Sequence, residues 1–319
     1  MLRALTAHGV RADLVVGASI GALNAVHFAA RPDAEGVEAL AALWLAVGAH
    51  DVLPRHPAEM LHAALRRLPA HPVQAVKAAL GVANYAFPIS PATLGLAIGG
   101  RRNYLFPSSH LEGFLSRSLP VHRLQDTVIP VEVLATENDT GCLVSLTNGP
   151  APTALLASSA IPGLFPVVRL AGMDLIDGMY ADATALDRAI DAGADRVYVL
   201  TTGFTCAVVN RPSTALGMAL HGFNLIAAQR MATSIARAPE SVELFVVPPV
   251  CPVEILPIDF SATADLLDRA TESTAEWLQS RPRPLTAGER HLGEPHLSAH
   301  IRARRNDVRA ASGDSRAGA

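Results

Sequence analysis

The sequence has few aromatic residues and little net charge, and each shortage excludes a class of protein. Phe, Trp and Tyr make up 5% of the 319 residues, although 50% are hydrophobic. Alanine and leucine supply most of the apolar share, which favours helices packed on a sheet over an all-β sandwich. The formal charge of −3 provides no basic surface for nucleic acid. We therefore expect an α/β protein without a nucleic-acid partner, long enough to bury a large core.

Cysteine is also scarce. The chain has three, Cys142, Cys206 and Cys251, and no two of them are separated by two residues. An odd number without this spacing argues against a disulfide framework and against a zinc site. The sequence therefore predicts a reducing compartment and a cytoplasmic protein.

Long hydrophobic runs are missing as well. No uninterrupted apolar run reaches the roughly 18 residues that a spanning helix needs, so we expect no transmembrane segment.

Residues 48–107 are broken by prolines and carry mostly basic charges, which is typical of a cap or insertion over a main sheet. Within it, residues 60–80 combine apolar side chains with Arg66, Arg67 and Lys77. Two interpretations stay open: a helix peripheral to an anionic membrane surface, or an ordinary amphipathic cap helix.

Predicted strands alternate with predicted helices along most of the chain. Short β-rich runs lie at 14–16, 128–135, 142–146, 167–176, 197–200 and 242–247. Helical segments lie between them, at 22–30, 37–47, 151–160, 185–192, 216–236 and 261–278. This alternation predicts an α/β fold with a mainly parallel sheet and helices on both faces. From residue 281 the periodicity disappears, and residues 281–319 are predicted to be a disordered tail.

The strongest local signal is the pentapeptide Gly17-Ala18-Ser19-Ile20-Gly21. It follows an apolar strand and precedes a helix of small residues, as a nucleophile elbow requires. A serine hydroxyl is a weak nucleophile unless a sharp turn exposes it and a base activates it. The helix that begins after Ser19 directs free N–H groups at an oxyanion, and the N–H of Ile20 is the natural first donor. The sequence therefore predicts Ser19 as a nucleophile, with Gly17 and Gly21 permitting the turn.

Four blocks in order resemble the patatin-like phospholipases. The first is VVGASIGALNA at 15–25, which looks like the nucleophile block of that family. The second, ASSAIPGLFP at 157–166, is similar to the segment before its aspartate, and Asp177-Gly178 is similar to its Asp-Gly-Gly or Asp-Gly-Ala motif. The fourth, IDFSAT at 258–263, resembles the start of its C-terminal helix. Together the resemblance covers residues 1–280.

This resemblance implies a three-layer patatin-type fold over residues 1–280 and a Ser–Asp dyad. Ser19 would attack an ester carbonyl and Asp177 would act as the only base, with Gly178 leaving room for the approach. The implied substrates are phospholipids, lysophospholipids or other lipid esters, and neither a metal nor an organic cofactor is implied. An ordinary aspartate has a pKa of about 3.9 and is a weak base for an alcohol. Burial of Asp177 would raise that pKa.

The sequence departs from the family pattern in two places. Met179 stands where the family has a small residue, which crowds the site beside Asp177. The family also has a Gly-rich loop before its first helix, which supplies further oxyanion donors, whereas this chain starts at Met1 inside that helix. We therefore expect weak activity, and an upstream extension of a few tens of residues with a Gly-Gly-Gly-type loop. The alternative is a catalytically crippled or truncated lipid-binding member.

Two other enzyme classes are open to the sequence. His291, His296 and His300 would complete a Ser-Asp-His order typical of α/β-hydrolases, but they lie in the predicted tail. A related acyltransferase is less favoured, because those proteins commonly place histidine before the serine, where this chain has Ala18.

Overall fold

The computed structural model describes residues 1–52, 103–104, 106–182, 185–201, 215–250 and 260–290. Most of the predicted cap, including residues 60–80, lies outside the described residues. So do the three tail histidines.

The central sheet has five strands and surrounds β2. Its members are β1 (Val15–Ala18), β2 (Val131–Glu137), β3 (Leu143–Leu146), β4 (Val168–Leu170) and β5 (Met173–Asp177). The order is β1-β2-β5-β4, and β3 also pairs with β2. Six of the seven residues of β2 are buried, as expected of a strand covered on both faces. Three strands, β1, β3 and β5, pair directly with β2, and β4 joins the sheet through β5.

The described strands pair in both directions. β1 runs parallel to β2, whereas β3 and β5 run antiparallel to β2 and β4 runs antiparallel to β5. Short connections explain two of the antiparallel pairs, β2 with β3 and β4 with β5, because a few residues can close only a hairpin. Ala171 and Gly172, with φ of 52° and 84°, form the turn between β4 and β5. The run at 167–176 is therefore a hairpin, and the expectation of a mainly parallel sheet is not confirmed.

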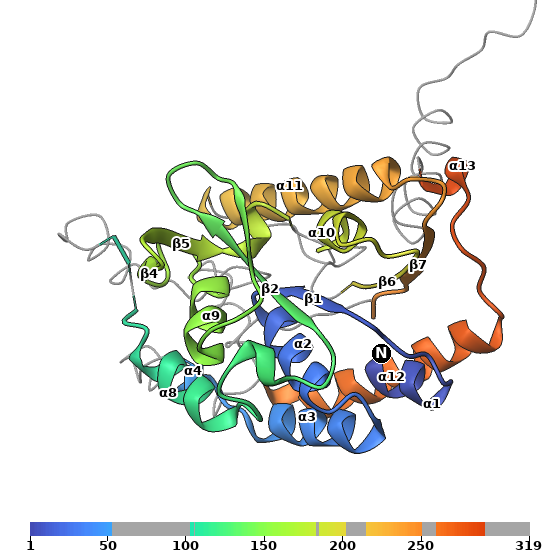
Figure 1. Ribbon diagram of the computed structural model, residues 1–319, viewed down its shortest axis with the longest axis horizontal. Helices are drawn as coiled ribbons and strands as arrows, with labels where there is room; N and C mark the ends of the chain where they lie inside the picture. The colour runs from blue at the N-terminus through green and yellow to red at the C-terminus, as the bar shows by residue number, and fades with distance from the viewer. Residues whose placement is uncertain (53–102, 105, 183–184, 202–214, 251–259, 291–319) are drawn as a thin grey trace, which may run out of the picture.

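Helices cover both sides of this sheet (Figure 1). On one side lie α2 (Ile20–Ala30), α3 (Ala34–Ala46), α4 (Ala49–Val52), α8 (Ser109–Ser118), η1 (Leu124–Asp126) and α9 (Ala151–Ser158). On the other side lie α10 (Leu186–Asp191) and α11 (Ala215–Arg237), close to a parallel pair formed by β6 (Arg196–Leu200) and β7 (Glu243–Val247). The alanines of α2, Ala22, Ala25 and Ala29, are buried, and their small size lets the helix lie close to β1 and β2.

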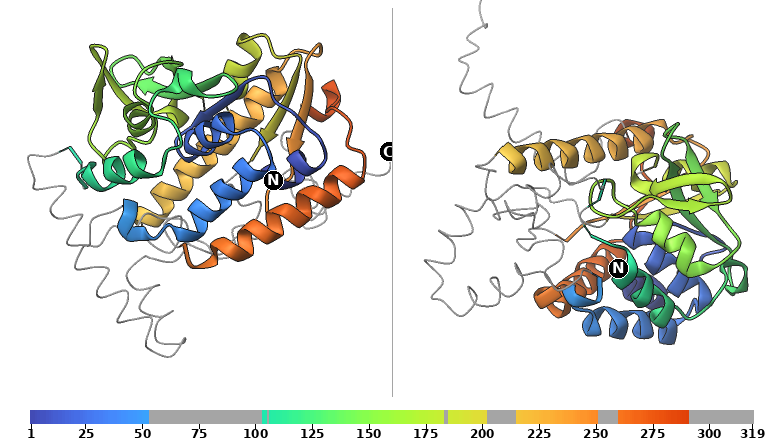
Figure 2. Two further views of the ribbon diagram at one scale, coloured as in Figure 1. Left: turned by 60° about the horizontal axis from the view of Figure 1, so that its bottom comes forward. Right: turned by 90° about the vertical axis from the view of Figure 1, so that its left-hand side faces the viewer.

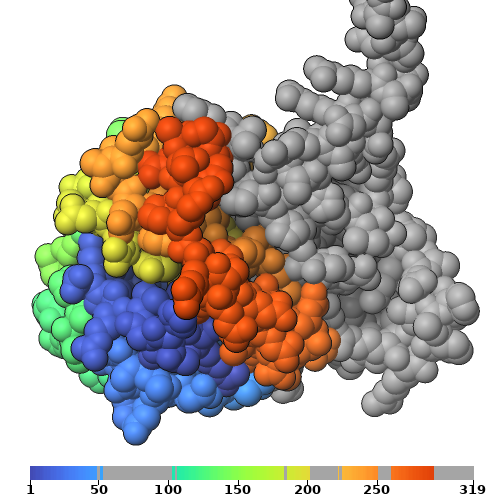
Figure 3. All heavy atoms as spheres, turned by 90° about the vertical axis from the view of Figure 1, so that its right-hand side faces the viewer, coloured from blue at the N-terminus to red at the C-terminus, as the bar shows by residue number. Residues whose placement is uncertain are grey.

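The remaining described elements are four helices near the chain ends and the short helix η2 that follows β5. They are α1 (Leu2–Ala7), η2 (Gly178–Tyr180), η3 (Phe260–Ala262), α12 (Thr263–Gln279) and α13 (Ala287–Arg290). α12 packs along α1 and α3 (Figure 2). Trp44 of α3 stacks on Phe260, with ring centroids 6.4 Å apart. The C-terminal part of the described chain therefore covers its N-terminal helix (Figure 3).

Residues 281–290 differ from the predicted disordered tail. They lie against the rest of the molecule, and Arg290 is only 3% exposed. Its guanidinium donates to the carbonyls of Ala238, Pro239 and Val242 at 2.6–2.8 Å, where α11 ends and β7 approaches. A cation that binds the negative end of a helix is stabilised there. Arg and Pro are typical both of disordered tails and of contacts with helix ends. The composition of residues 281–290 therefore did not reveal that Arg290 binds the end of α11.

Candidate active site

Ser19 lies at a sharp turn between β1 and α2. Its φ of 52° and ψ of −126° are unusual for a residue with a side chain. A backbone of this kind is strained by about 1–3 kcal/mol and persists only where its surroundings hold it. Gly17 makes the turn possible, because a Cβ there would lie 2.6 Å from the carbonyl oxygen of Gly21. Gly21 itself has open space around its Cβ position, so the turn does not require glycine there.

Backbone N–H groups around Ser19 have different roles. The N–H of Ser19 donates to Ser158 Oγ at 2.8 Å, so it is not free to bind a substrate. Ile20 and Gly21 open α2, and the first N–H groups of a helix have no carbonyl partner within it. The side chain of Ile20 is 52% exposed, so this end of the helix is accessible. The predicted oxyanion donor, Ile20, is thus in a position to donate.

Asp177 reaches Ser19 because two strands end against each other beside β2. β1 pairs with the first half of β2, with Ala18 opposite Leu134. β5 pairs with the second half, with Asp177 opposite Ala135. β3 occupies the other edge of β2 along both halves, so β1 and β5 share one edge. Since β1 is parallel and β5 antiparallel to β2, their carboxyl ends meet between Leu134 and Ala135.

The side chain of Asp177 is completely buried. Its Oδ1 accepts a hydrogen bond of 2.9 Å from the N–H of Met179, while Oδ2 has no hydrogen-bond partner among the described residues. Burial raises the pKa of Asp177 to about 6, against the lowering effects of the Met179 N–H and the Ser19 hydroxyl. Ser19 is therefore close enough to act on the carboxylate, although no regular hydrogen bond joins them in this structure.

The backbone around Asp177 is fixed from β2. Thr136 Oγ1 donates to the carbonyl of Asp177 at 2.9 Å and accepts from the N–H of Ala181 at 3.1 Å. Gly178 passes so close to β2 that a Cβ would lie 2.2 Å from the carbonyl oxygen of Leu134. The glycine after the aspartate is therefore required by contact with β2. Met179, which the sequence analysis flagged as crowding, supplies the N–H that binds Asp177.

The structure places Ser19 and Asp177 close to each other, with Gly17, Ile20 and Gly21 in the turn at Ser19 and Gly178 directly after Asp177. Two residues at the site were not predicted: Ser158, which lies within the block at 157–166, and Thr136, which belongs to no motif. Each hydroxyl bonds two backbone groups that are distant in the chain, Ser158 those of Ser19 and Leu134, and Thr136 those of Asp177 and Ala181. Such contacts leave no periodic or spacing signal in a sequence.

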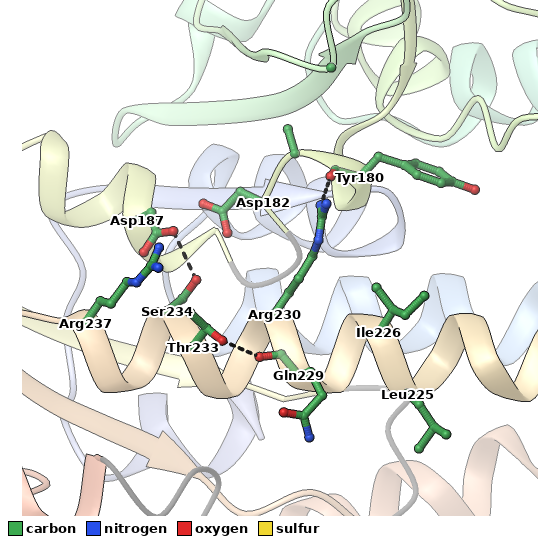
Figure 4. A pocket seen from close by; sticks show the side chains of 12 residues that line it. Tyr180, Asp182, Asp187, Leu225, Ile226, Gln229, Arg230, Thr233, Ser234 and Arg237 are labelled. Carbon is green, nitrogen blue, oxygen red and sulfur yellow. Dashed lines mark hydrogen bonds between the residues drawn. The ribbon is translucent and has the colours of Figure 1, made fainter.

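A groove lies beside the segment that follows Asp177 (Figure 4). It has a volume of about 550 Å³ and lies between α11 and a wall formed by Tyr180, Ala181, Asp182 and Asp187. Burial and the negative charge of Asp177 raise the pKa of Tyr180, so this wall adjoins the buried carboxylate. Ala181, also in this wall, shares the Thr136 hydroxyl with Asp177.

The α11 side of the groove is amphipathic. Leu225 and Ile226 are 53% and 59% exposed and lie at one end. Arg230 and Arg237 follow, two turns apart on the same face, and Arg230 donates to the carbonyl of Tyr180 (Figure 4). Ser234, between the arginines, donates to Asp187 Oδ2 at 3.0 Å. The groove therefore offers apolar surface together with charges of both signs.

The described residues contain neither a metal-binding cluster nor a membrane-spanning helix. No group of three or more His, Cys, Asp or Glu side chains there is arranged to hold a metal ion. No helix there is both long and apolar enough to cross a bilayer.

The sequence matches a model of a known protein family. The sequence model of a family described as patatin-like phospholipase matches residues 1–190, more than half of the chain. The matched segment contains Ser19, Ser158 and Asp177. A search of curated proteins found no match.

Proposed function

Because the chain belongs to the patatin-like phospholipase family, we propose that it is a serine acyl hydrolase with a Ser19–Asp177 dyad. The family assignment supports action on lipid esters in general. The dyad and the three-layer patatin-type arrangement are the finer parts of the proposal. One observation supports the dyad. Asp177 Oδ2 is buried and has no hydrogen-bond partner among the described residues, and the nearby Ser19 hydroxyl lowers the pKa of this carboxylate.

The reaction follows from these two groups. Ser19 Oγ attacks the ester carbonyl carbon while its proton passes to Asp177 Oδ2. The carbon–oxygen bond to the leaving alcohol then breaks, and Asp177 returns the proton to that alcohol. Water attacks the acyl-serine with the same proton transfers, which releases the carboxylic acid and restores Ser19.

A single carboxylate is a reasonable base here because of its environment. With a pKa of about 6, Asp177 is ionised at neutral pH yet accepts a proton more readily than an exposed aspartate. The N–H of Ile20 and the positive end of α2 lower the demand on this base by stabilising the oxyanion.

The substrate we propose is a phospholipid or lysophospholipid. The groove beside Asp177 supports this choice, because it combines the exposed Leu225 and Ile226 with two arginines and with carboxylates. An amphipathic molecule with both signs of charge in its head group matches that surface. We place the head group of a zwitterionic phospholipid there, with its phosphate on Arg230 and Arg237.

One observation favours a second candidate, a lipid-binding protein with little turnover. Ser158 binds the N–H of Ser19, so near Ser19 the described residues leave only the first N–H groups of α2, those of Ile20 and Gly21, as oxyanion donors. Losing one donor lowers kcat by about 10²–10³ in other hydrolases. Labelling with a fluorophosphonate separates the candidates, since only a working nucleophile is modified.

The deciding experiment uses that probe and a soluble p-nitrophenyl ester. Ser19→Ala should abolish both labelling and hydrolysis, and Asp177→Asn should lower kcat by about 10²–10⁴ with a smaller change in KM. Ser159→Ala serves as a control. Full activity of Ser19→Ala would refute the proposal.

The triad alternative needs its own variant. A chain that ends after Arg290 lacks His291, His296 and His300 but keeps the buried Arg290 contacts. We expect it to retain activity, whereas a triad enzyme would lose it. A cut at residue 282 would be a poor test, because it would also remove Arg290.

A further inference from the structure

Ser158 is a buried hydroxyl that joins three elements at the nucleophile. It ends α9 and is 0% exposed. Its Oγ accepts the N–H of Ser19 at 2.8 Å and donates to the carbonyl of Leu134 at 2.5 Å. Since an N–H can only donate and a carbonyl can only accept, the position of the Ser158 proton is determined. The proton of this hydroxyl is held by Leu134 and the side chain is fully buried, so we assign Ser158 no nucleophilic role.

Ser19 needs such a contact because its backbone is strained. A residue with a side chain rarely adopts a φ of 52° together with a ψ of −126°. Strain of this kind persists where neighbouring groups over-determine the conformation. The hydrogen bond from Ser19 N to Ser158 Oγ is the one described side-chain contact to the Ser19 backbone. It opposes relaxation of the turn.

The same contact relates the nucleophile to the base. The carbonyl oxygen of Leu134, which accepts from Ser158, is also the atom that a Cβ at Gly178 would meet first, at 2.2 Å. One peptide of β2 therefore bears on Ser158 on one side and on the residue after Asp177 on the other. A shift at Ser158 would change the distance between Ser19 and Asp177.

We infer that Ser158 is a positioning residue for the Ser19–Asp177 reaction, an inference that rests on the proposed function. It holds the Ser19 backbone in the attacking conformation and keeps the Ser19 N–H turned away from the substrate. Ser158 touches neither the substrate nor the reacting atoms.

Ser158→Ala tests this role, with Ser159→Ala as the matched control. Ser159 is the next residue of the same helix end, and the structure gives its side chain no hydrogen bond to the described residues. Ser158→Ala leaves two buried backbone groups without a partner, so kcat should fall about tenfold or more while KM changes less than about twofold. Fluorophosphonate labelling should slow in parallel. Ser159→Ala should match the parent protein in both measurements.

Amide hydrogen exchange provides a readout that does not depend on activity. In Ser158→Ala the amide of Ser19 should exchange about tenfold faster or more, and in Ser159→Ala it should not. If Ser19→Ala remained active, the proposed function would fail, yet exchange would still test the Ser158 contact.

Two results would overturn the inference: unchanged kcat and labelling in folded Ser158→Ala, or a lower melting temperature as its only effect. Should Ser158→Ala not fold, Ser158→Cys takes its place. A thiol fills the same space but is a weak hydrogen-bonding group, so kcat should again fall with KM little changed. A parent-like kcat for the cysteine variant would equally contradict the inference.

Discussion

Ala18 and Asp177 occupy successive positions along one edge of β2, Ala18 opposite Leu134 and Asp177 opposite Ala135. They end two strands that approach each other from opposite directions. The residue after Ala18 is Ser19, so Ser19, the proposed nucleophile, lies at the point where β5 ends. β2 therefore sets the separation of the two groups through its own residue spacing.

Gly178→Ala should disrupt the site, whereas Gly21→Ala should not disrupt the fold. A Cβ at Gly178 would lie 2.2 Å from the Leu134 oxygen, and backbone would have to move. We expect a loss of about 1–3 kcal/mol in the free energy of unfolding and a large fall in kcat. Gly21 has open space at its Cβ position, so its variant should unfold like the parent protein. Urea unfolding and ester hydrolysis of both variants check this, and equal stability of the two would contradict it.

Asp177→Asn should stabilise the protein at alkaline pH while removing activity. Burial raises the pKa of Asp177 to about 6 in the folded state, above the unfolded value of about 3.9. The folded state then binds this proton more tightly, so the stability that it contributes is complete below pH 3.9 and is lost as pH rises through 6. Above pH 7 the free energy of unfolding is lower by about 3 kcal/mol than it would be with this proton bound. The gain in melting temperature of Asp177→Asn over the parent should thus be larger at pH 8 than at pH 4.5.

Asp174→Asn is the control for that measurement. Asp174 lies on the same strand, but its side chain is exposed. Its effect on melting temperature should be small and nearly the same at both pH values. A gain for Asp177→Asn that did not depend on pH would show that the buried carboxylate carries no such penalty.

The rate of ester hydrolysis should rise as pH passes about 6, because only the ionised form of Asp177 can accept the proton of Ser19. A pH profile of kcat/KM on a soluble ester measures this midpoint. The chain that ends after Arg290 should give the same profile. A midpoint that disappears with that truncation would instead assign the titration to a histidine of the tail.

Arg230→Gln and Arg237→Gln should impair phospholipid hydrolysis selectively. A guanidinium on a phosphate contributes about 1.5–3 kcal/mol, so each change should lower kcat/KM on dispersed short-chain phosphatidylcholine about tenfold. Hydrolysis of the p-nitrophenyl ester, which has no phosphate, should be unchanged. Arg169→Gln, an exposed arginine on β4 outside the groove, is the control. Equal losses on both substrates would contradict a head-group site.

Much of the local structure was predictable from the sequence. The predicted helices at 22–30, 151–160, 185–192 and 216–236 agree within two residues with α2, α9, α10 and α11. These segments have helical composition throughout and clear ends. The direction of strand pairing was less accessible, because the hairpin between β4 and β5 depends on a two-residue turn inside an apolar run. The ordered contacts of residues 281–290 were missed because they depend on one buried arginine.

The sequence by itself determined the turn at Ser19. An apolar strand, a glycine at position 17 and a helix of small residues are local features, and the close approach of Gly17 to Gly21 involves only neighbours in the chain. Only the tertiary structure decided that the carboxylate of Asp177 lies beside Ser19 and that its pKa is raised. Asp177 meets Ser19 because β1 and β5 share one edge of β2, and its pKa is raised because the surrounding layers exclude water. Desolvation and strand adjacency depend on residues far apart in the chain, so no local pattern could give them.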